Sequence, residues 1–290
     1  MKRRAKYNRI HAFDVILYIV MFVFLAIIIL PFMNIISVSL SDMGEVSAGR
    51  VTIWPRGFSL QTYKDMLSTG KFTQAYMNTI IYTVCGTALS LITTAMAAYA
   101  LSRRRMVGHK LFSIMITITM FFGGGLIPTY LAVSSYGLTN TRWALILPGM
   151  ISTWNLIVMR SFFVAYPQEI VESGMIDGLR DPGVFLRLVL PTSKAALATI
   201  GLYYAVAYWN AYMNARIYIR DKDLYPVQHL LQTMVAEVTA EGTQGDSDYT
   251  LPAASVRNAA IMIVITPIMC VYPFIQKYFV KGVMVGSIKG

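Results

Sequence analysis

The chain has 290 residues, of which 56% are hydrophobic and 13% are charged, and its mean hydropathy is +0.55. Soluble globular chains carry about 25% charged residues, so the composition excludes an ordinary soluble domain and indicates an integral membrane protein. The formal net charge of +11 would suggest nucleic-acid binding in a soluble domain, but in a membrane protein the topology explains it.

Six stretches contain no Asp, Glu, Lys or Arg, and each predicts a membrane-spanning helix. A helix needs roughly 17 to 25 mostly apolar residues to cross the hydrocarbon core. The stretches have 27, 31, 31, 17, 21 and 19 residues, so the sequence predicts an all-α integral membrane protein with six transmembrane helices. In chain order they are residues 15–41, 72–102, 111–141, 143–159, 195–215 and 258–276.

The basic residues predict which connecting segments face the cytoplasm. With a cytoplasmic N-terminus, the inner segments hold sixteen Lys and Arg and five acids, a net +11, whereas the outer segments hold nine of each. Because positive residues concentrate on the cytoplasmic side, we predict that both termini are cytoplasmic. The predicted organisation is a basic N-terminus (1–14) and a single transmembrane domain (15–290) with a cytoplasmic loop (165–194), an outer loop (216–256) and a cytoplasmic tail (277–290).

The cytoplasmic loop carries its own helix signals. Pro167 and Glu169 suit a helix start, because proline lacks a donor that would be orphaned there and an acid complements the helix dipole. Asp177-Gly178 suits its end, where glycine turns easily. With a second helix expected over 183–190, the loop predicts a helix, a sharp turn and a helix that protrude from the membrane. The alternative is an amphipathic helix that lies on the bilayer.

These residues resemble the EAA motif of permease subunits in binding-protein-dependent ABC importers. In that motif Glu-Ala-Ala, three residues and Gly precede a hydrophobic-x-hydrophobic-Pro ending. Here Ser173 and Gly174 replace the two alanines, which weakens the literal match. The matching residues are Glu172-Ser173-Gly174, 175–177, Gly178, 188–190 and Pro191, and the further segments 121–130, 143–148, 203–210 and 276–290 resemble maltose-type sugar permeases, in the branch named for a lipoprotein-linked oligosaccharide system.

The resemblance implies a type I importer permease fold that works by alternating access in a bacterial cytoplasmic membrane. The implied partners are a second, homologous permease subunit, two cytoplasmic ABC ATPase subunits, an extracytoplasmic solute-binding protein and membrane lipid. The cytoplasmic loop would form a coupling helix that lies in a cleft of an ATPase subunit. The residues implied in coupling are Glu169, Glu172, Ser173, Gly174, Met175, Ile176, Asp177, Gly178, Phe185, Pro191, Gly286, Ser287, Lys289 and Gly290.

The energy source is indicated by residue types that the six stretches lack. None contains Asp, Glu, Lys, Arg or His, so we do not expect the chain to carry its own proton or sodium coupling. The sequence has no Gly-x4-Gly-Lys-Ser/Thr phosphate-binding loop either. We therefore expect no enzymatic activity and no cofactor on this chain, with ATP and Mg²⁺ on the partner ATPase. The three histidines lack metal-ligand spacing, so no metal site is expected.

The fifth stretch is the richest in side chains suited to a sugar. Tyr204, Tyr208 and Tyr212 recur at four-residue intervals, which places them on one helix face. Aromatic rings stack on sugar faces and amides pair with hydroxyls, although tyrosines near a membrane interface also form aromatic belts. The expected substrate path consists of Tyr203, Tyr204, Tyr208, Trp209 and Asn210.

Other features leave alternatives open. The run 123–125, Gly-Gly-Gly, permits either a broken helix or close helix packing, and we favour close packing. By the same resemblance, residues 241–249 of the outer loop dock with the binding protein. The branch points to oligosaccharides, with uronate-containing ones as an option. Two other classes are a channel, which would work without ATP, and a membrane sugar or lipid transferase, whose acidic candidates would be Glu169, Glu172, Asp177 and Asp181.

Overall fold

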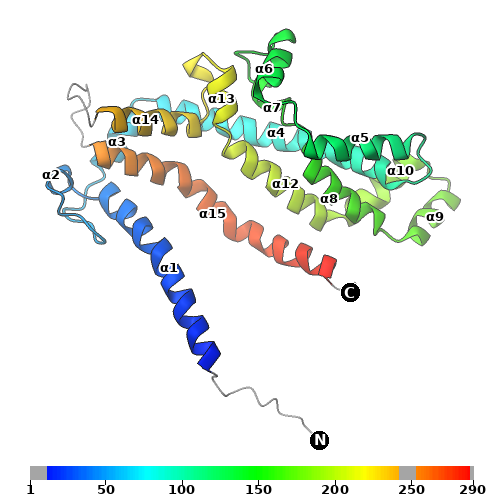
Figure 1. The fold of residues 1–290 in the computed structure, drawn as a ribbon, viewed down its shortest axis with the longest axis horizontal. Coiled ribbons are helices and arrows are strands. Elements are labelled where there is room, and N and C mark those ends of the chain that lie inside the picture. The colour runs from blue at the N-terminus through cyan, green and yellow to red at the C-terminus, as the bar shows by residue number, and fades with distance from the viewer. Residues whose placement is uncertain (1–11, 242–252, 288–290) are drawn as a thin grey trace, which may run out of the picture. The chain divides into compact units, whose positions relative to one another are not determined.

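The structure is a computed structural model of the chain and describes residues 12–241 and 253–287. Within these ranges every regular element is a helix, and no strand occurs (Figure 1). The predicted all-helical class is therefore confirmed. The chain divides into two compact units, one made of residues 1–69 and 234–265 and the other of residues 70–233 and 266–290.

The first unit contains α1 (Ala12–Ser39), α2 (Met43–Ser47), α3 (Gln61–Ser68), the last part of α14 (Val227–Glu241) and the first part of α15 (Ala253–Ser287). Within Phe13–Ser39, the most apolar 18 residues have a mean hydropathy of 3.1 and none of them is buried inside the chain, whereas Ser37, Val38 and Ser39 at the end of the stretch are buried. A helix that is apolar on every face needs an apolar environment around it, and this one is long enough to cross a bilayer. The first predicted stretch therefore forms a helix suited to lipid.

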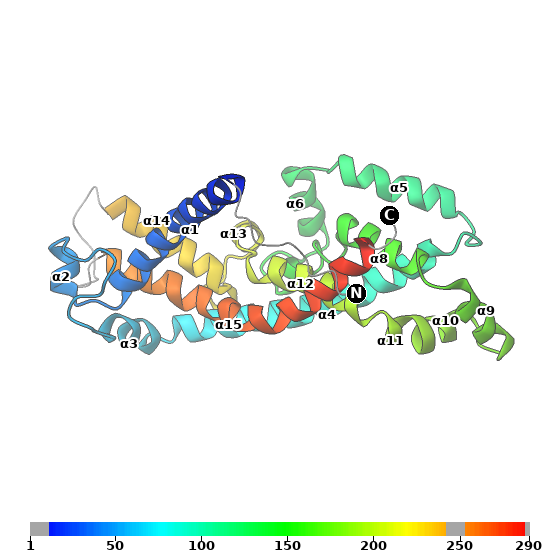
Figure 2. The same cartoon turned by 90° about the horizontal axis from the view of Figure 1, so that it is seen from below.

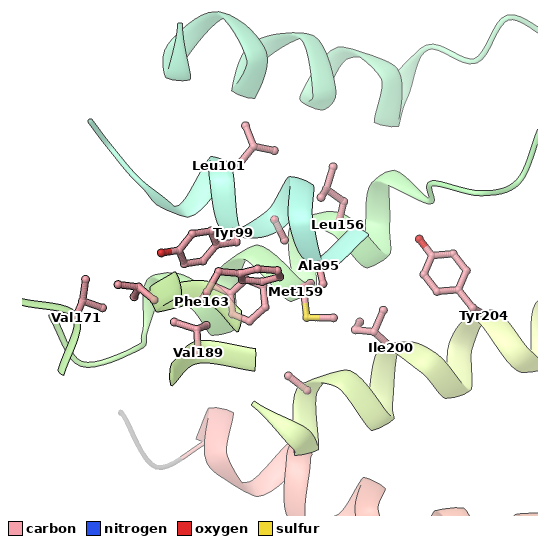
Figure 3. Close-up of a cluster of buried hydrophobic side chains, with 14 of the residues drawn as sticks. Ala95, Tyr99, Leu101, Leu156, Met159, Phe163, Val171, Val189, Ile200 and Tyr204 are labelled. Carbon is pink, nitrogen blue, oxygen red and sulfur yellow. The ribbon is translucent and has the colours of Figure 1, made fainter. Parts of the chain in front are cut away.

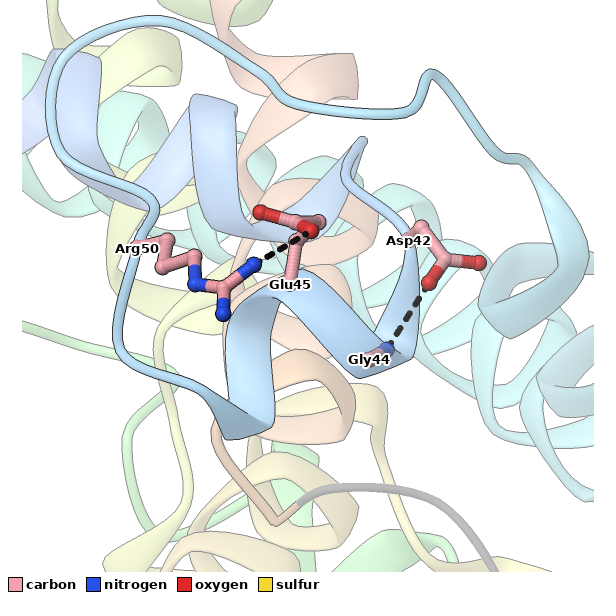
Figure 4. A network of polar contacts seen from close by, with 4 residues as sticks. All are labelled: Asp42, Gly44, Glu45 and Arg50. Carbon is pink, nitrogen blue, oxygen red and sulfur yellow. Dashed lines mark hydrogen bonds and ion pairs between the residues drawn. The ribbon is translucent and has the colours of Figure 1, made fainter.

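The segment that follows α1 is shaped by local polar contacts. Asp42 caps α2 by accepting a hydrogen bond from the Gly44 N–H at 2.9 Å, and Arg50 pairs with Glu45 at 3.4 Å (Figure 4). Both contacts join residues that are close in sequence. They therefore stabilise the conformation of the loop itself rather than the packing of helices.

The second unit is organised along α4 (Lys71–Ser102), which has 32 residues. At 1.5 Å per residue its length is about 48 Å, enough to span a bilayer. The helices α8 (Thr153–Val164) and α12 (Lys194–Trp209) pack along it. A Cβ added at Gly86 of α4 would lie 2.7 Å from the Tyr208 ring of α12, so glycine allows this close approach.

Two apolar clusters hold the second unit together. One joins α4, α8 and α12 to α9 (Gln168–Ile176) and α10 (Asp181–Val184), and its side chains interdigitate in Figure 3. The other joins α4 to α6 (Leu126–Ser135), α7 (Trp143–Ile146) and α13 (Met213–Tyr218). The remaining helices are α5 (His109–Phe121), a π-helical turn (Phe185–Val189), α11 (Leu190–Thr192), a 3₁₀ turn (Lys222–Leu224) and the first part of α14.

The third predicted stretch is broken at its glycine run. The helices α5 and α6 meet at a bend of 118°. Gly125 has φ +82° and ψ 173°, a conformation that essentially only glycine adopts. Among the described residues, chain neighbours aside, no atom lies within 4 Å of a Cβ built at Gly123, Gly124 or Gly125. The expectation of close packing is therefore wrong, and the run instead breaks the helix.

The fourth predicted stretch is not a continuous helix, because α7 ends at Ile146 and α8 begins at Thr153. Pro148 and Gly149 lie in the gap, where both residue types disfavour helix. Ser152 then starts α8 by accepting a hydrogen bond from the Asn155 N–H at 3.4 Å. The described residues contain three helices that are long and apolar enough to cross a membrane, or up to five if each bent pair is one span. Six crossings and their orientation stay predictions.

Candidate functional site

The coupling segment, residues 167–192, lies beyond one end of α4, as the positions of α9 and α10 in Figures 1 and 2 show. Its helix α9 turns Val171, which is 1% exposed, and Gly174 toward the protein. Met175 and Ile176 are 42% and 87% exposed. Glu169, Glu172 and Ser173 are exposed as well. The helix therefore presents a mixed polar and apolar surface to its surroundings.

The turn after α9 requires glycine. Gly178 has φ +85°, in the left-handed region that side chains with a Cβ rarely adopt. The Leu179 N–H reaches back over the turn to the Gly174 carbonyl at 2.9 Å, and the Gly178 N–H donates to the Met175 carbonyl at 3.1 Å. Asp177 is the last residue before this glycine and is exposed. The predicted helix end at Asp177-Gly178 is thus where the helix ends.

The second half of the coupling segment differs from the expected helix over 183–190. The chain is helical from Asp181 to Thr192, with a π-helical turn over Phe185–Val189. Pro191 lies inside this helical run, in α11, rather than after it. Because proline cannot donate to the carbonyl four residues earlier and its ring crowds that carbonyl, the wider π turn before it relieves the conflict. The run then bends by 82° into α12.

The two halves of the coupling segment pack closely against each other. A Cβ added at Gly174 of α9 would lie 2.6 Å from Cδ1 of Leu188 in the π turn. Glycine at this position therefore allows the two helical pieces to approach more closely than a larger residue would. The pair behaves as one packed body rather than as two independent helices.

An aromatic cluster joins the coupling segment to the C-terminal end of α4. The Tyr99 ring lies 4.8 Å from the Phe185 ring and 6.3 Å from the Phe163 ring, centroid to centroid, and Figure 3 shows Tyr99 beside Phe163. The Tyr99 hydroxyl donates to the Asp181 carbonyl at 3.3 Å. The Arg103 guanidinium donates to that hydroxyl at 2.8 Å and lies 4.6 Å from the ring centroid. The coupling segment and the C-terminal end of α4 are therefore in direct contact.

The remaining predicted coupling residues lie near the C-terminus. Gly286 and Ser287 are the last residues of α15, the long C-terminal helix. Lys289 and Gly290 lie outside the described residues, as do residues 242–249 of the outer loop that we expected to dock with a binding protein. These parts of the prediction stay predictions.

A second site is a cavity of about 410 Å³ within the second unit, lined by residues of α7, α8, α12 and α13 and of the gap between α7 and α8. Its volume lies in the range typical of small-molecule sites. No Asp, Glu, Lys or Arg lines it. Its polar and aromatic lining residues are Ser152, Trp154, Asn155, Tyr203, Tyr204, Tyr208 and Asn214.

Tyr204 and Tyr208 of α12 line the cavity, and their hydroxyl groups link α12 to α4 and to the backbone between α7 and α8; we call these two residues the hydroxyl ladder. The Tyr208 hydroxyl donates to the Ile146 carbonyl at 3.0 Å and lies 2.9 Å from Ser90 Oγ, which therefore donates to it. One turn away, the Tyr204 hydroxyl accepts from the Ser152 N–H at 2.9 Å and lies 2.7 Å from Thr94 Oγ1 of α4. Both tyrosines are buried, and Figure 3 shows Tyr204 beside Ile200 on α12.

The ladder binds backbone groups that the interruption between α7 and α8 would otherwise leave unpaired. The Ile146 carbonyl lies at the end of α7, and the Ser152 N–H lies just before α8. Non-helical backbone at membrane depth is tolerated only where protein or water satisfies its polar groups. The ladder thus stabilises the interrupted segment and the cavity that it borders.

The predicted substrate-path residues divide into two groups. Tyr203, Tyr204 and Tyr208 line the cavity, whereas Trp209 and Asn210 do not. The Trp209 ring packs 6.3 Å from the Tyr76 ring, and Asn210 accepts a hydrogen bond from Gln228 Nε2 at 3.0 Å. The helix α12 ends at Trp209, so Tyr212, which precedes α13, is not part of the same helical row.

The prediction missed Ser152, Trp154 and Asn155 because it treated residues 143–159 as one apolar span. A signal was present in the sequence: Pro148-Gly149 followed by Ser152 is typical of a helix break and a new N-cap. Polar residues just after such a restart face a gap between helices. In the described part of the chain, no group of three or more His, Cys, Asp or Glu side chains could hold a metal ion.

Known proteins resemble the chain along nearly its whole length. It is 40% identical over 283 residues to the polygalacturonan/rhamnogalacturonan transport system permease protein YtcP of Bacillus subtilis (strain 168), covering 96% of this chain and 98% of that protein. It is 42% identical over 269 residues to protein LplC of the same organism, covering 91% and 90%. No protein-family model matches the chain.

A solved structure has the same fold as the chain. The chain matches one from the crystal structure of a bacterial ABC transporter involved in the import of the acidic polysaccharide alginate, with a TM-score of 0.87 and 31% identity over 95% of this chain and 100% of that chain. Such permeases are transport subunits rather than enzymes, and they act in membrane complexes with other subunits. The chain belongs to the family of ABC sugar transporter permeases and is a permease of a sugar importer.

Proposed function

We propose that this chain is one of two homologous permease subunits of an ATP-driven importer that moves an oligosaccharide into the cytoplasm by alternating access. The observation that carries the proposal is the form of the coupling segment. Its exposed end, around Met175 and Ile176, offers contacts to another protein, while its base packs on α4 through Tyr99 and Phe185. Such a segment receives movement from a partner and passes it to a long helix.

The path of that movement follows α4. When two ATPase subunits close on ATP, the coupling segment moves as one packed body, because Gly174 and Leu188 hold its halves together. The aromatic cluster carries the movement to the C-terminal end of α4. At the other end Asn78 donates to the Asp223 carbonyl at 2.6 Å and Tyr82 donates to the Leu224 carbonyl at 2.8 Å, so that loop follows the helix.

The proposal includes a six-crossing topology with both termini in the cytoplasm of a bacterial cell, where the chain lies in the cytoplasmic membrane. The partners are the second permease, two ABC ATPase subunits and an extracytoplasmic solute-binding protein. ATP and Mg²⁺ bind to the ATPase subunits, because the chain has no phosphate-binding loop of its own. The arginine and lysine surplus of the predicted inner segments supports this orientation.

For the substrate we propose oligosaccharides that include uronate residues. YtcP is named for polygalacturonan and rhamnogalacturonan transport, and the matched structure is described as importing acidic alginate. The cavity of this chain offers aromatic and amide side chains, which suit carbohydrate rings and hydroxyls.

Gentle extraction of the tagged chain from its native membrane tests the proposed function. We expect a second permease and an ATPase at about twice the abundance of either permease, identified by mass spectrometry, with ATP hydrolysis in the purified complex. Recovery of the chain without an ATPase in several mild detergents would contradict the proposal. A complex that hydrolyses ATP but takes up no oligosaccharide would contradict the substrate class alone.

A further inference from the structure

The cavity beside α12 is polar without being charged. The residues that line it include tyrosine, tryptophan, serine and asparagine side chains but no Asp, Glu, Lys or Arg. An acidic sugar in this cavity would therefore meet no cation among these lining residues that could pair with its carboxylate. Recognition here must come from ring faces and hydroxyl groups.

The hydroxyl groups of the two ladder tyrosines, Tyr204 and Tyr208, already form hydrogen bonds within the protein. Each hydroxyl of Tyr204 and Tyr208 contacts one α4 side chain and one backbone group of the interrupted segment. A sugar could take their hydrogen bonds only by unpairing those groups, which costs free energy when they are buried. These tyrosines are therefore positioning residues that hold the cavity wall.

Two neighbouring residues of α8, Trp154 and Asn155, line the cavity with side chains that are suited to contact a ligand. Asn155 is 6% exposed and lines the cavity, and no hydrogen bond between described residues engages its side-chain amide. Buried amides are normally satisfied, so this amide is suited to a ligand that donates and accepts hydrogen bonds. Trp154 lines the same cavity and is 58% exposed, which leaves its indole available for stacking.

We propose that this cavity is a sugar-ring subsite in which Trp154 stacks on one ring and the Asn155 amide pairs with its hydroxyls, without discrimination by charge. The inference rests on the proposed function, and it adds which residues contact the sugar and that they select it by its ring and hydroxyl groups. Any preference for acidic over neutral oligosaccharides then resides in the partner permease or the binding protein.

A charge introduced at Asn155 tests whether that residue faces the sugar. The full complex with its binding protein is reconstituted in liposomes, and uptake of trigalacturonate is compared with uptake of its methyl ester, which has the same rings and no charge. Asn155→Asp should lower the acid-to-ester uptake ratio about tenfold or more relative to wild type, because like charges repel strongly away from water. Assay at about pH 8 keeps a partly buried carboxylate ionised.

Asn210→Asp is the matched control. Asn210 lies at the end of α12, does not line the cavity, and accepts from Gln228 through an oxygen that aspartate retains, while its exposed Nδ2 hydrogen bond to the Val206 carbonyl is lost. Its acid-to-ester ratio should stay within about twofold of wild type. Equal ratios for Asn155→Asp and wild type, or an equal fall in both variants, would overturn the assignment of Asn155.

A second experiment removes the indole ring of Trp154 and tests whether that ring stacks on the sugar. Trp154→Ala should raise the KM for both sugars about 3- to 10-fold and leave their ratio unchanged, since a ring face does not sense charge. Trp143→Ala, a tryptophan of α7 that is 51% exposed but does not line the cavity, should leave both KM values unchanged. Equal effects of the two substitutions, or loss of the second permease from the Trp154→Ala complex, would show that the indole packs against protein and overturn its role.

The outcomes separate the two levels of inference. If the wild-type complex takes up neither sugar, the proposed substrate class fails and this subsite fails with it. If wild type takes up both sugars but the Asn155 and Trp154 variants behave as their controls do, the subsite alone is overturned and the importer assignment stands.

Discussion

The two ends of α4 are held in different ways. At the N-terminal end, side chains of α4 form hydrogen bonds with the backbone of 223–227: Asn78 and Gln74 donate to the Asp223 carbonyl at 2.6 and 3.1 Å, and Thr79 Oγ1 accepts from the Val227 N–H at 2.8 Å. At the C-terminal end, the Tyr99 ring makes an edge contact with Phe163 and a tilted contact with Phe185, and its hydroxyl donates one hydrogen bond to the Asp181 carbonyl at 3.3 Å.

The difference shows how one helix can serve two tasks. Hydrogen bonds are directional, so the loop at the N-terminal end must follow α4 wherever it moves. Apolar and aromatic contacts are less directional, so the coupling segment can tilt against Phe163 and Phe185 without losing all of its contact. In the proposed mechanism, α4 is fixed to the loop at its N-terminal end, the pinned end, and receives the movement of the coupling segment at its C-terminal end, the pushed end.

The largest expected effect is at the pushed end. Gly178→Glu should reduce uptake to less than about a tenth of wild type, because it adds backbone strain of roughly 1–2 kcal/mol and a charge at the turn beside the exposed tip. Uptake and membrane abundance are measured together, and the protein should remain in the membrane.

Gly137→Glu is the matched control, because Gly137 has φ +67° and, like Gly178, no atom within 4 Å of a built Cβ, but lies outside the coupling segment. Gly137→Glu should add a similar backbone strain but leave uptake unchanged. Normal transport by Gly178→Glu, or equal loss in both variants, would remove the special role of this turn.

The next effect concerns the packing within the coupling segment. Gly174→Val should cost about 1–3 kcal/mol and impair uptake, since its side chain would overlap Leu188. Gly174→Ala should be milder, because only the end of the Leu188 side chain has to move. Leu188→Ala in the valine background should restore uptake in part, and no rescue in this double variant would refute the packed-body description.

At the pinned end, Asn78→Leu should lower the free energy of unfolding by about 1–3 kcal/mol, because it removes the donor to the Tyr225 carbonyl and the shorter of the two hydrogen bonds to the Asp223 carbonyl. Thermal unfolding of the purified complex measures this loss. Gln74→Leu, which removes one exposed hydrogen bond, should cost less. If the two variants are equally stable, the hydrogen bonds do not pin this end.

A smaller, pH-dependent effect is expected near the same loop. Burial and the charge of Arg216 lower the pKa of His229, so the folded protein binds a proton less readily than the unfolded chain does. Stability is then constant above the ordinary histidine pKa of about 6.5 and decreases as the pH falls below it. His229→Gln should weaken that decrease in unfolding experiments between about pH 7 and pH 5, and an identical pH profile would exclude a role for His229.

The smallest effect is expected in the first unit, at the exposed ion pair beside α2. Arg50→Gln breaks the exposed ion pair with Glu45 and should change the free energy of unfolding by no more than about 1 kcal/mol. Uptake by the Arg50→Gln complex, and its dependence on ATP, should be the same as in wild type. A large transport defect would show that this loop has a role that its local contacts do not suggest.

The sequence predicted the coupling segment well because its signals are local. The proline start, the acid in the first turn and the Asp177-Gly178 end determine α9 within a few residues. The π turn before Pro191 was not predictable, because it results from a conflict between proline and continued helix that the surrounding packing resolves.

The cavity was only half predictable from the sequence. The tyrosine row was visible at four-residue spacing, but its role depends on Ser90 and Thr94, which belong to another helix. Charge-free length alone could not show that 143–159 is interrupted, because hydrophobicity measures lipid compatibility and not helix continuity. Trp154 and Asn155 therefore became visible only in the structure.

The most direct test of the coupling role is cross-linking from the exposed tip of α9. In a complex whose chain has Cys85 and Cys270, both exposed, replaced by serine, Ile176→Cys carries a short thiol-to-amine cross-linker. We expect a product with an ATPase subunit whose yield changes when ATP is added, and none from Gly137→Cys. An assembled complex in which Ile176→Cys gives no ATPase product would contradict the claim that this segment receives the movement of the ATPase.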